Sequence, residues 1–232
     1  MTFTDRMLMS ATLDGTALAV STVIFALGAE GLRIPLVRRI REPFDGRWAL
    51  PGGPVELNEN LDASASRNLL ETTALTSTYL EQLYCFGDVD RSPGQRVVSV
   101  VYWALVRSDE AAQAAVDENV QWFAADELPE LAFDHNRIVE YALWRLRTKL
   151  EYSQIAHAFL GPTFTLAELR EVYEAVLRKP VDPANFRRQL EKSLVDTGER
   201  LTGARHRPPR LYRYDSTVAM TDNGPLTTRI EA

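Results

Sequence analysis

The chain contains very little cysteine: of its 232 residues, only Cys85 carries a thiol. A single thiol cannot close an internal disulfide, so a disulfide-stapled secreted scaffold is excluded. Cys85 stands in an apolar context, and nothing in the pattern around it marks it as a nucleophile. We therefore expect it to be a reduced residue of the hydrophobic core, as is typical of cytoplasmic proteins.

Long apolar runs are also absent. The longest, from Ala17 to Leu27, has about 11 residues, whereas a helix that crosses a bilayer needs about 20. The start of the chain offers only Arg6 beside Asp5 and lacks the basic stretch of a secretory signal. These absences predict a cytoplasmic protein without a membrane partner.

Positive charge is scarce in the chain as a whole, whose net charge is −6, but it is concentrated in one segment. Between Arg178 and Arg213, ten Lys or Arg residues stand against four acidic residues, a net charge of +6 that leaves −12 on the rest. A basic segment joined to an acidic body is the asymmetry expected when one part of a protein binds a polyanion.

The apolar pattern predicts an α/β fold in the first two thirds of the chain. An apolar content of 45% is enough for one large or two modest cores. Apolar residues at helical spacing predict helices at 59–73 and 134–150. The buried face of the first helix is expected to hold Leu61, Ala65, Leu69 and Leu70. Alternating or continuous apolar runs predict strands at 17–27, 34–40, 80–86, 97–106 and 120–123.

One stretch carries a specific motif. It begins with Trp48-Ala-Leu-Pro-Gly-Gly53 and continues through Glu59 into a helix that holds Arg67 and Glu71. Glycines in such a loop leave backbone amides free to face phosphate oxygens. The stretch resembles a Nudix box, the loop-helix signature of enzymes that cleave a diphosphate attached to a nucleoside.

The catalytic half of this box is altered. An intact box clusters three glutamates on its helix, but two of these positions hold Asn68 and Thr72 here, and the closing glycine is Ala74. Residues at i, i+3 and i+4 share a helix face, which is where a divalent cation needs carboxylate oxygens. Only Glu71 remains, with Glu56 and Glu59 as possible helpers. We expect no metal, no catalytic residue, and at most very slow hydrolysis from a vestigial box made of Gly53, Glu59, Arg67, Asn68, Glu71 and Thr72.

The resemblance implies that a nucleotide ligand is retained. Hydrolases of ADP-ribose in this family carry an arginine on an early strand and a ligand-facing loop before the long central strand. The residues of this chain that match are Arg38, Arg47, Trp48, Gly53, Asp88 and Arg91. The alternatives are a solvated strand edge for Arg38 and a plain turn for the loop at 88–91.

After Tyr152 the pattern changes to two short helices and a basic hairpin. Thr165 and Glu168 predict a capping box at the start of the first helix. Asp182-Pro183 predicts the start of the second, whose buried stripe should hold Phe186, Leu190 and Leu194. Helix, turn, helix and hairpin in this order predict a winged helix-turn-helix.

In a winged helix-turn-helix, the second helix enters the major groove of double-stranded DNA. Arginine reads guanine through two parallel hydrogen bonds, so Arg187 and Arg188 are the expected base contacts. The expected phosphate contacts are Lys192, Arg205, Arg207 and Arg210. The alternative is a helical extension with a solvated basic face.

The order of the two parts resembles the Nudix-related transcriptional regulators of bacterial NAD metabolism. The resemblance implies a Nudix α/β/α sandwich with a mixed sheet at 1–152, a winged helix-turn-helix domain at 153–216 and a loosely held tail at 217–232. It also implies a homodimer that represses genes of NAD synthesis or salvage, requires no cofactor, and senses ADP-ribose or a related nucleotide.

Two other functions remain open from the sequence. The first is a Nudix hydrolase of ADP-ribose or another nucleoside diphosphate derivative, with metal held by Glu56, Glu59 and Glu71. The second is a protein that binds a nucleotide and a protein partner but no DNA.

Overall fold

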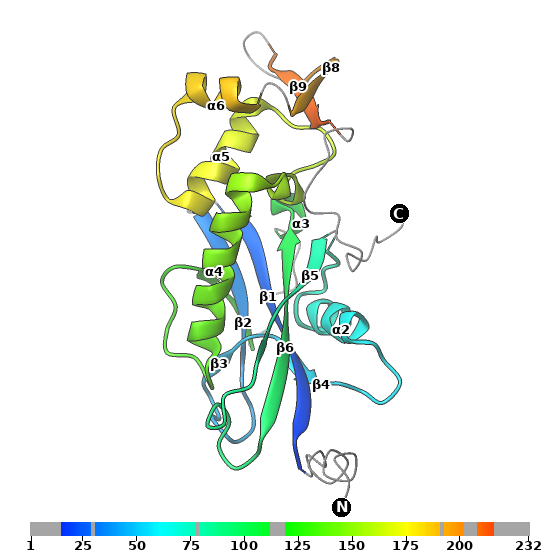
Figure 1. Ribbon diagram of the computed structural model, residues 1–232, viewed down its shortest axis with the longest axis vertical. Helices are drawn as coiled ribbons and strands as arrows, with labels where there is room; N and C mark the ends of the chain where they lie inside the picture. Colours follow the sequence, from blue (N-terminus) through cyan, green and yellow to red (C-terminus); the bar gives the residue numbers. More distant parts are fainter. Residues whose placement is uncertain are drawn as a thin grey trace, which may run out of the picture.

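The computed structural model describes residues 15–28, 31–77, 79–111, 119–190, 193–201 and 208–215 (Figure 1). Three predicted phosphate contacts, Lys192, Arg205 and Arg207, lie outside these residues, as does the tail from 217 to 232.

A mixed sheet of seven strands forms the centre of the N-terminal part. The two most apolar strands, β1 (Ala17–Gly28) and β6 (Val97–Val106), pair in parallel, and the other strand pairs of this sheet are antiparallel. The strand order is β3-β2-β1-β6-β5, with β4 beside β1 and β7 beside β2. The remaining strands are β2 (Gly31–Arg38), β3 (Trp48–Ala49), β4 (Gly52–Pro54), β5 (Tyr79–Phe86) and β7 (Val120–Ala124).

Two helices cover opposite faces of this sheet (Figure 1). Side chains alternate between the faces of a strand, so Val23 and Phe25 of β1 pack with α4 (His135–Tyr152), whereas Ile24 and Ala26 pack with α2 (Leu61–Thr73). The short helix α3 (Ser108–Ala111) follows β6. The predicted α/β/α sandwich with a mixed sheet is confirmed. Among the described residues, no helix combines the length and apolar character needed to cross a membrane.

The helix of the Nudix-like stretch differs from prediction at one position. Leu69 is buried as expected, but Leu70 is 51% exposed, so its assignment to the buried face was wrong. Adjacent residues are about 100° apart around a helix, and Leu69 already points at the sheet. The helix ends at Ala74, whose left-handed conformation (φ 56°, ψ 19°) is the one that favours glycine, the residue an intact box has there.

The C-terminal part is a small helical unit with a two-stranded wing (Figure 1). Its elements are η1 (Ile155–Phe159), α5 (Leu166–Leu177), α6 (Pro183–Leu190), β8 (Leu194–Arg200) and β9 (Arg210–Tyr214). Strands β8 and β9 pair antiparallel, and Phe164 joins the wing to α5 by two backbone hydrogen bonds to Tyr212. This arrangement confirms the predicted winged helix-turn-helix.

The starts of both helices follow the predicted chemistry. The Thr165 hydroxyl accepts a hydrogen bond from the Glu168 backbone N–H at 3.1 Å, and the Glu168 carboxylate accepts one from the Thr165 backbone N–H at 2.7 Å. Asp182 caps α6 by accepting from the Asn185 backbone N–H at 2.8 Å. The buried stripe of α6 ends earlier than predicted, because the helix stops at Leu190 and Leu194 instead begins β8.

The two parts share one hydrophobic core. Phe159 of η1 and Leu169 and Val172 of α5 are buried in the same cluster as Phe25 of β1 and Trp103 of β6. The winged unit is therefore packed against the end of the sheet and is not a separate body on a linker. Any displacement of this end of the sheet acts directly on α5.

Cys85 is exposed, so the prediction that it is a core residue was wrong. It lies on β5, an edge strand that pairs only with β6 among the described strands. A register shift between Gln82 and Tyr84 breaks the alternation of inward and outward side chains. Apolar neighbours in the sequence therefore do not indicate burial at this position.

Candidate functional site

The loop that enters the Nudix-like stretch is held against the sheet by backbone contacts. The Leu50 backbone N–H donates to Nδ1 of His135 at 2.9 Å, and the Thr22 N–H donates to the Pro51 carbonyl at 2.8 Å. A Cβ added to Gly52 would lie 2.5 Å from the Val20 carbonyl oxygen, so only glycine allows this close approach. Gly53 has more room, because a Cβ added there would lie 3.7 Å from Oδ1 of Asn68.

Arg67 joins this loop to α2. Its guanidinium donates two hydrogen bonds to the Glu59 carboxylate, at 2.7 and 3.1 Å, and lies 3.4 Å from Glu71 and 3.8 Å from Glu56. Glu59 also accepts from the Glu56 backbone N–H at 2.9 Å. The hydrogen bonds from Arg67 and from this N–H lower the pKa of Glu59 from 4.5 to about 2. Glu59 is thus an ionised anchor of the loop.

These residues do not fit a divalent ion held as in an intact box. Glu59 and Glu71 both face Arg67, whose positive charge opposes a nearby cation. Asn68 is only 4% exposed, and its amide nitrogen has no hydrogen-bond partner within the described part of the chain. Within the same part, no three His, Cys, Asp or Glu side chains come together in a metal-binding group.

Three predicted ligand residues gather at the β2–β3 edge. Arg38 and Trp48 are partners across the two strands, and the Arg38 guanidinium donates to the Gly46 carbonyl at 3.4 Å. The next residue, Arg47, forms an exposed ion pair with Glu130 at 2.6 Å. The Trp48 ring lies edge-on to Phe123 of β7, with centroids 5.2 Å apart. The edge therefore presents two exposed guanidinium groups beside a half-buried indole.

The other predicted ligand residues lie elsewhere. Arg91 is buried and makes a two-point ion pair with Asp134, the N-cap residue of α4, at 2.7 and 3.0 Å. Asp88 is exposed and pairs with Arg137 in the first turn of the same helix. Gly53 lies on β4, beside α2. The structure thus divides the predicted set among the β2–β3 edge, the start of α4 and the Nudix-like loop.

Sequence analysis did not identify His135, which positions the loop. This side chain is 6% exposed, and burial lowers its pKa from 6.5 to about 3 because the charged imidazolium cannot be solvated. A neutral ring has one acceptor nitrogen, and here Nδ1 accepts from the Leu50 N–H. The residue lies at the start of a helix far from the loop in sequence, so no local pattern indicates the contact.

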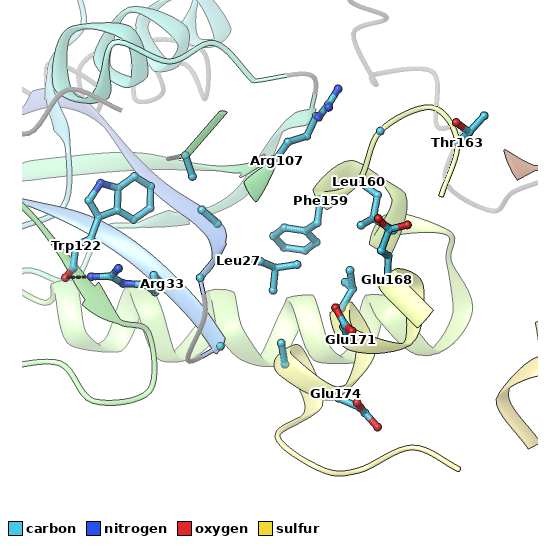
Figure 2. Close-up of a pocket in the computed structure, with 17 residues that line it drawn as sticks. Leu27, Arg33, Arg107, Trp122, Phe159, Leu160, Thr163, Glu168, Glu171 and Glu174 are labelled. Atoms are coloured by element: carbon cyan, nitrogen blue, oxygen red, sulfur yellow. Dashed lines mark hydrogen bonds between the residues drawn. The ribbon is translucent and has the colours of Figure 1, made fainter. Parts of the chain in front are cut away.

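A cavity with a volume of about 1090 Å³ lies at the junction of the two parts, and the residues that line it are drawn in Figure 2. Arg33 and Trp122 line it from the sheet, Phe159 lines it from η1, and Glu168 and Glu171 line it from α5. The described residues around it include none of the predicted ligand contacts. These lining residues come from segments that are distant in the sequence, so no local sequence motif predicts the cavity.

The candidate DNA-binding surface is on α6 and the wing. Arg187 and Arg188 are both exposed on α6, as their predicted role requires. Arg210 begins β9 and pairs with Asp196 of β8 at 2.6 Å. The backbone N–H of Gly198 and this arginine lower the pKa of Asp196.

The fold and these surfaces define a class of protein, a Nudix domain followed by a winged helix domain. Comparison with known families supports both parts. The NUDIX domain family matches residues 16–142, and the family described as the NrtR DNA-binding winged helix domain matches residues 156–214.

Similar proteins have the same two-part organisation. The "ADPR responsive transcriptional repressor NtrR" of Acinetobacter baylyi is 35% identical over 204 residues, which cover 85% of this chain and 81% of that protein. The crystal structure of Shewanella oneidensis NrtR complexed with a 27mer DNA has 37% identity and a TM-score of 0.73, covering 85% of this chain and 93% of that one. The chain therefore belongs to the NrtR family of Nudix-related transcriptional regulators.

A third similar structure concerns the Nudix part alone. It is the NUDIX domain of Shewanella oneidensis NrtR complexed with ADP ribose, with 32% identity and a TM-score of 0.50. The match covers 63% of this chain and 99% of that one.

The buried His135 predicts a pH dependence of stability. Its folded pKa of about 3 lies below the unfolded value of 6.5, so its contribution is complete above pH 6.5 and is lost as the pH falls from 6.5 toward 3. Each unit by which the pH falls in this window should lower the free energy of unfolding by about 1.4 kcal/mol, because unfolding takes up one proton.

The substitution His135→Asn tests this, because Asn Oδ1 can replace Nδ1 as the acceptor for Leu50. Urea unfolding at pH 6.5 and pH 5 should show a smaller loss of stability in the variant, by about 1 to 2 kcal/mol. Equal losses in the two proteins would mean that His135 is not buried in the neutral form.

Proposed function

We propose that the chain is a DNA-binding transcriptional repressor whose Nudix domain binds ADP-ribose or a related nucleotide. One observation carries the proposal: α5, the helix before the candidate recognition helix, is buried in the core of the Nudix sheet. A nucleotide that shifts this sheet therefore acts on the DNA-binding unit. The Acinetobacter relative, an ADPR-responsive transcriptional repressor, and the Shewanella NrtR structures with DNA and with ADP ribose support both halves of the proposal.

The nucleotide is bound without being turned over. The loop at 50–54 keeps its glycines, whose backbone amides suit phosphate oxygens, and Arg67 ties Glu59, further along the same stretch, to α2. Arg38, Arg47, Trp48, Gly53, Asp88 and Arg91 remain the proposed ligand contacts. Since the box carboxylates are paired with Arg67 or replaced, the chain itself is not a hydrolase and needs no cofactor.

The DNA half works as a homodimer on a two-fold symmetric operator. Two copies of α6 would enter successive major grooves, whose half-sites are about one helical turn, or a multiple of it, apart. Arg187 and Arg188 face the bases, while Lys192, Arg205, Arg207 and Arg210 contact phosphates. The family resemblance assigns the regulated genes to NAD synthesis or salvage.

A polar clamp couples the two domains. Asp126, in the turn after β7, accepts from Arg147 of α4 at 2.7 Å and lies 3.7 Å from Arg178, which caps the C-terminus of α5. Arg147 also donates to the Val176 carbonyl of α5 at 2.9 Å. The clamp is three residues beyond Phe123, which contacts Trp48 of the proposed ligand edge. A ligand that moves Trp48 can thus move the end of α5.

The main test measures operator affinity with and without nucleotide. Purified full-length protein should bind DNA from upstream of its own neighbouring genes, and saturating ADP-ribose should change that affinity by about 5- to 150-fold at fixed salt. Fluorescence anisotropy with labelled DNA gives both affinities. Unchanged affinity would contradict the sensing half, and absence of sequence-specific binding would contradict the DNA half.

The substitution Asp126→Asn tests the clamp. It removes the charge that holds Arg147 and Arg178, so ADP-ribose should still bind but should change operator affinity much less than in the wild type. Glu171→Gln is the matched control, because it removes an exposed acid from α5 outside the clamp. Equal ADP-ribose effects in the Asp126 variant and the wild type would mean that the clamp does not transmit the signal.

Restoring the box tests why turnover is absent. The double variant Asn68→Glu/Thr72→Glu places three carboxylates on one face of α2, where they can bind Mg²⁺ or Mn²⁺. AMP release from ADP-ribose should rise at least about 10-fold over the wild type and should stop with EDTA. Wild-type turnover of about 1 per second or more would instead favour the hydrolase.

A further inference from the structure

The two arginines of α6, Arg187 and Arg188, point in different directions from the helix axis. Phe186 is buried and Leu190 is half-buried, and together they turn one side of the helix toward the core. Arg188 is two residues from Phe186, about 200° around the axis, so it points away from the core. Arg187 is three residues before Leu190 and so lies toward the side of the helix.

Asn185 shares the outward face with Arg188. The two residues are at i and i+3, and Oδ1 of Asn185 accepts a hydrogen bond from Nη2 of Arg188 at 2.7 Å. Asn185 is itself fixed in the first turn of α6, because its backbone N–H donates to the capping Asp182 at 2.8 Å. The exposed guanidinium is thus tied to the first turn of the helix, which Asp182 caps.

This hydrogen bond leaves Arg188 able to read a base. A guanidinium has five N–H donors, and the bond to Asn185 uses one, so four remain, of which two can bond to O6 and N7 of a guanine. An arginine side chain loses much rotamer freedom when it binds, and one that is already oriented loses less. In helix-turn-helix proteins the first turns of the second helix approach the base edges, which is where Asn185 and Arg188 lie.

We propose that Asn185 is a positioning residue for sequence recognition, which orients Arg188 so that it reads one guanine in each half-site. The proposal rests on the proposed DNA-binding function. In this proposal, Asn185 and Arg188 act together in recognising the base.

The experiment is a binding-site selection from a random DNA pool with the full-length protein, followed by affinity measurements on the selected site. Replacing the guanine read by Arg188 should weaken wild-type binding by about 5- to 150-fold. Asn185→Ala should reduce that preference by about 2- to 10-fold, at the same base position that Arg188→Ala affects. The double variant should be no worse than Arg188→Ala alone, because Asn185 acts through Arg188.

Two further variants separate positioning from other effects. Asn185→Asp keeps an acceptor for Arg188 but adds a negative charge, so the guanine preference should persist while affinity falls on all sequences alike. Gln189→Ala, an exposed change on the same helix, should alter neither property. Unfolding curves of every variant check that the fold is intact.

The outcomes distinguish this inference from the proposed function. If the wild type enriches no sequence, the DNA-binding function itself fails. If it enriches a site but Asn185→Ala keeps the full guanine preference, or relaxes a different base position, Asn185 does not position Arg188.

Discussion

The structure depends on the burial of α5 against the end of the Nudix sheet. Leu169, Val172 and Val176 of α5, and Phe186 of α6, lie in the same hydrophobic cluster as the central strands. A unit of about 60 residues buries a smaller share of its surface than a larger domain and is only marginally stable alone. Packing into the shared core stabilises the DNA-binding unit. It also fixes the orientation of α5 relative to the Nudix sheet, so that a change in the sheet can alter the DNA-binding unit.

The residues of the Nudix box have a structural role in this chain, in which charged side chains tie the loop to α2. In an intact box the carboxylates bind metal, whereas here Glu59 and Glu71 face Arg67, and Glu59 ties the loop to α2. A buried Asn68 replaces a carboxylate whose charge would be costly beside the sheet without a cation. The surviving residues of the box therefore hold the loop at Glu59 on α2 through the contacts of Arg67.

Much of this could be predicted from sequence where the cause is local. The capping box at Thr165, the cap at Asp182 and the strand at 97–106 were confirmed, because each depends on neighbouring residues. The burial of Leu70 and Cys85 was predicted wrongly, since helix phase and a strand irregularity decide it. His135 and Asp126 were missed because their partners are distant in sequence. The proposed ligand set matched the family motif, but a motif does not tell which face of the sheet each residue occupies.

Charge distribution adds a constraint on how the parts cooperate. The segment from Arg178 to Arg213 carries +6 and the rest of the chain −12, so the body repels DNA while the winged end attracts it. Arg178 and Arg210 are each paired with an aspartate, which removes part of the positive charge from general attraction. In the part of the chain that the structure describes, Arg188 donates to the neutral amide of Asn185, and this contact does not offset its charge. The two ion pairs of Arg178 and Arg210 thereby moderate the attraction to any phosphate backbone.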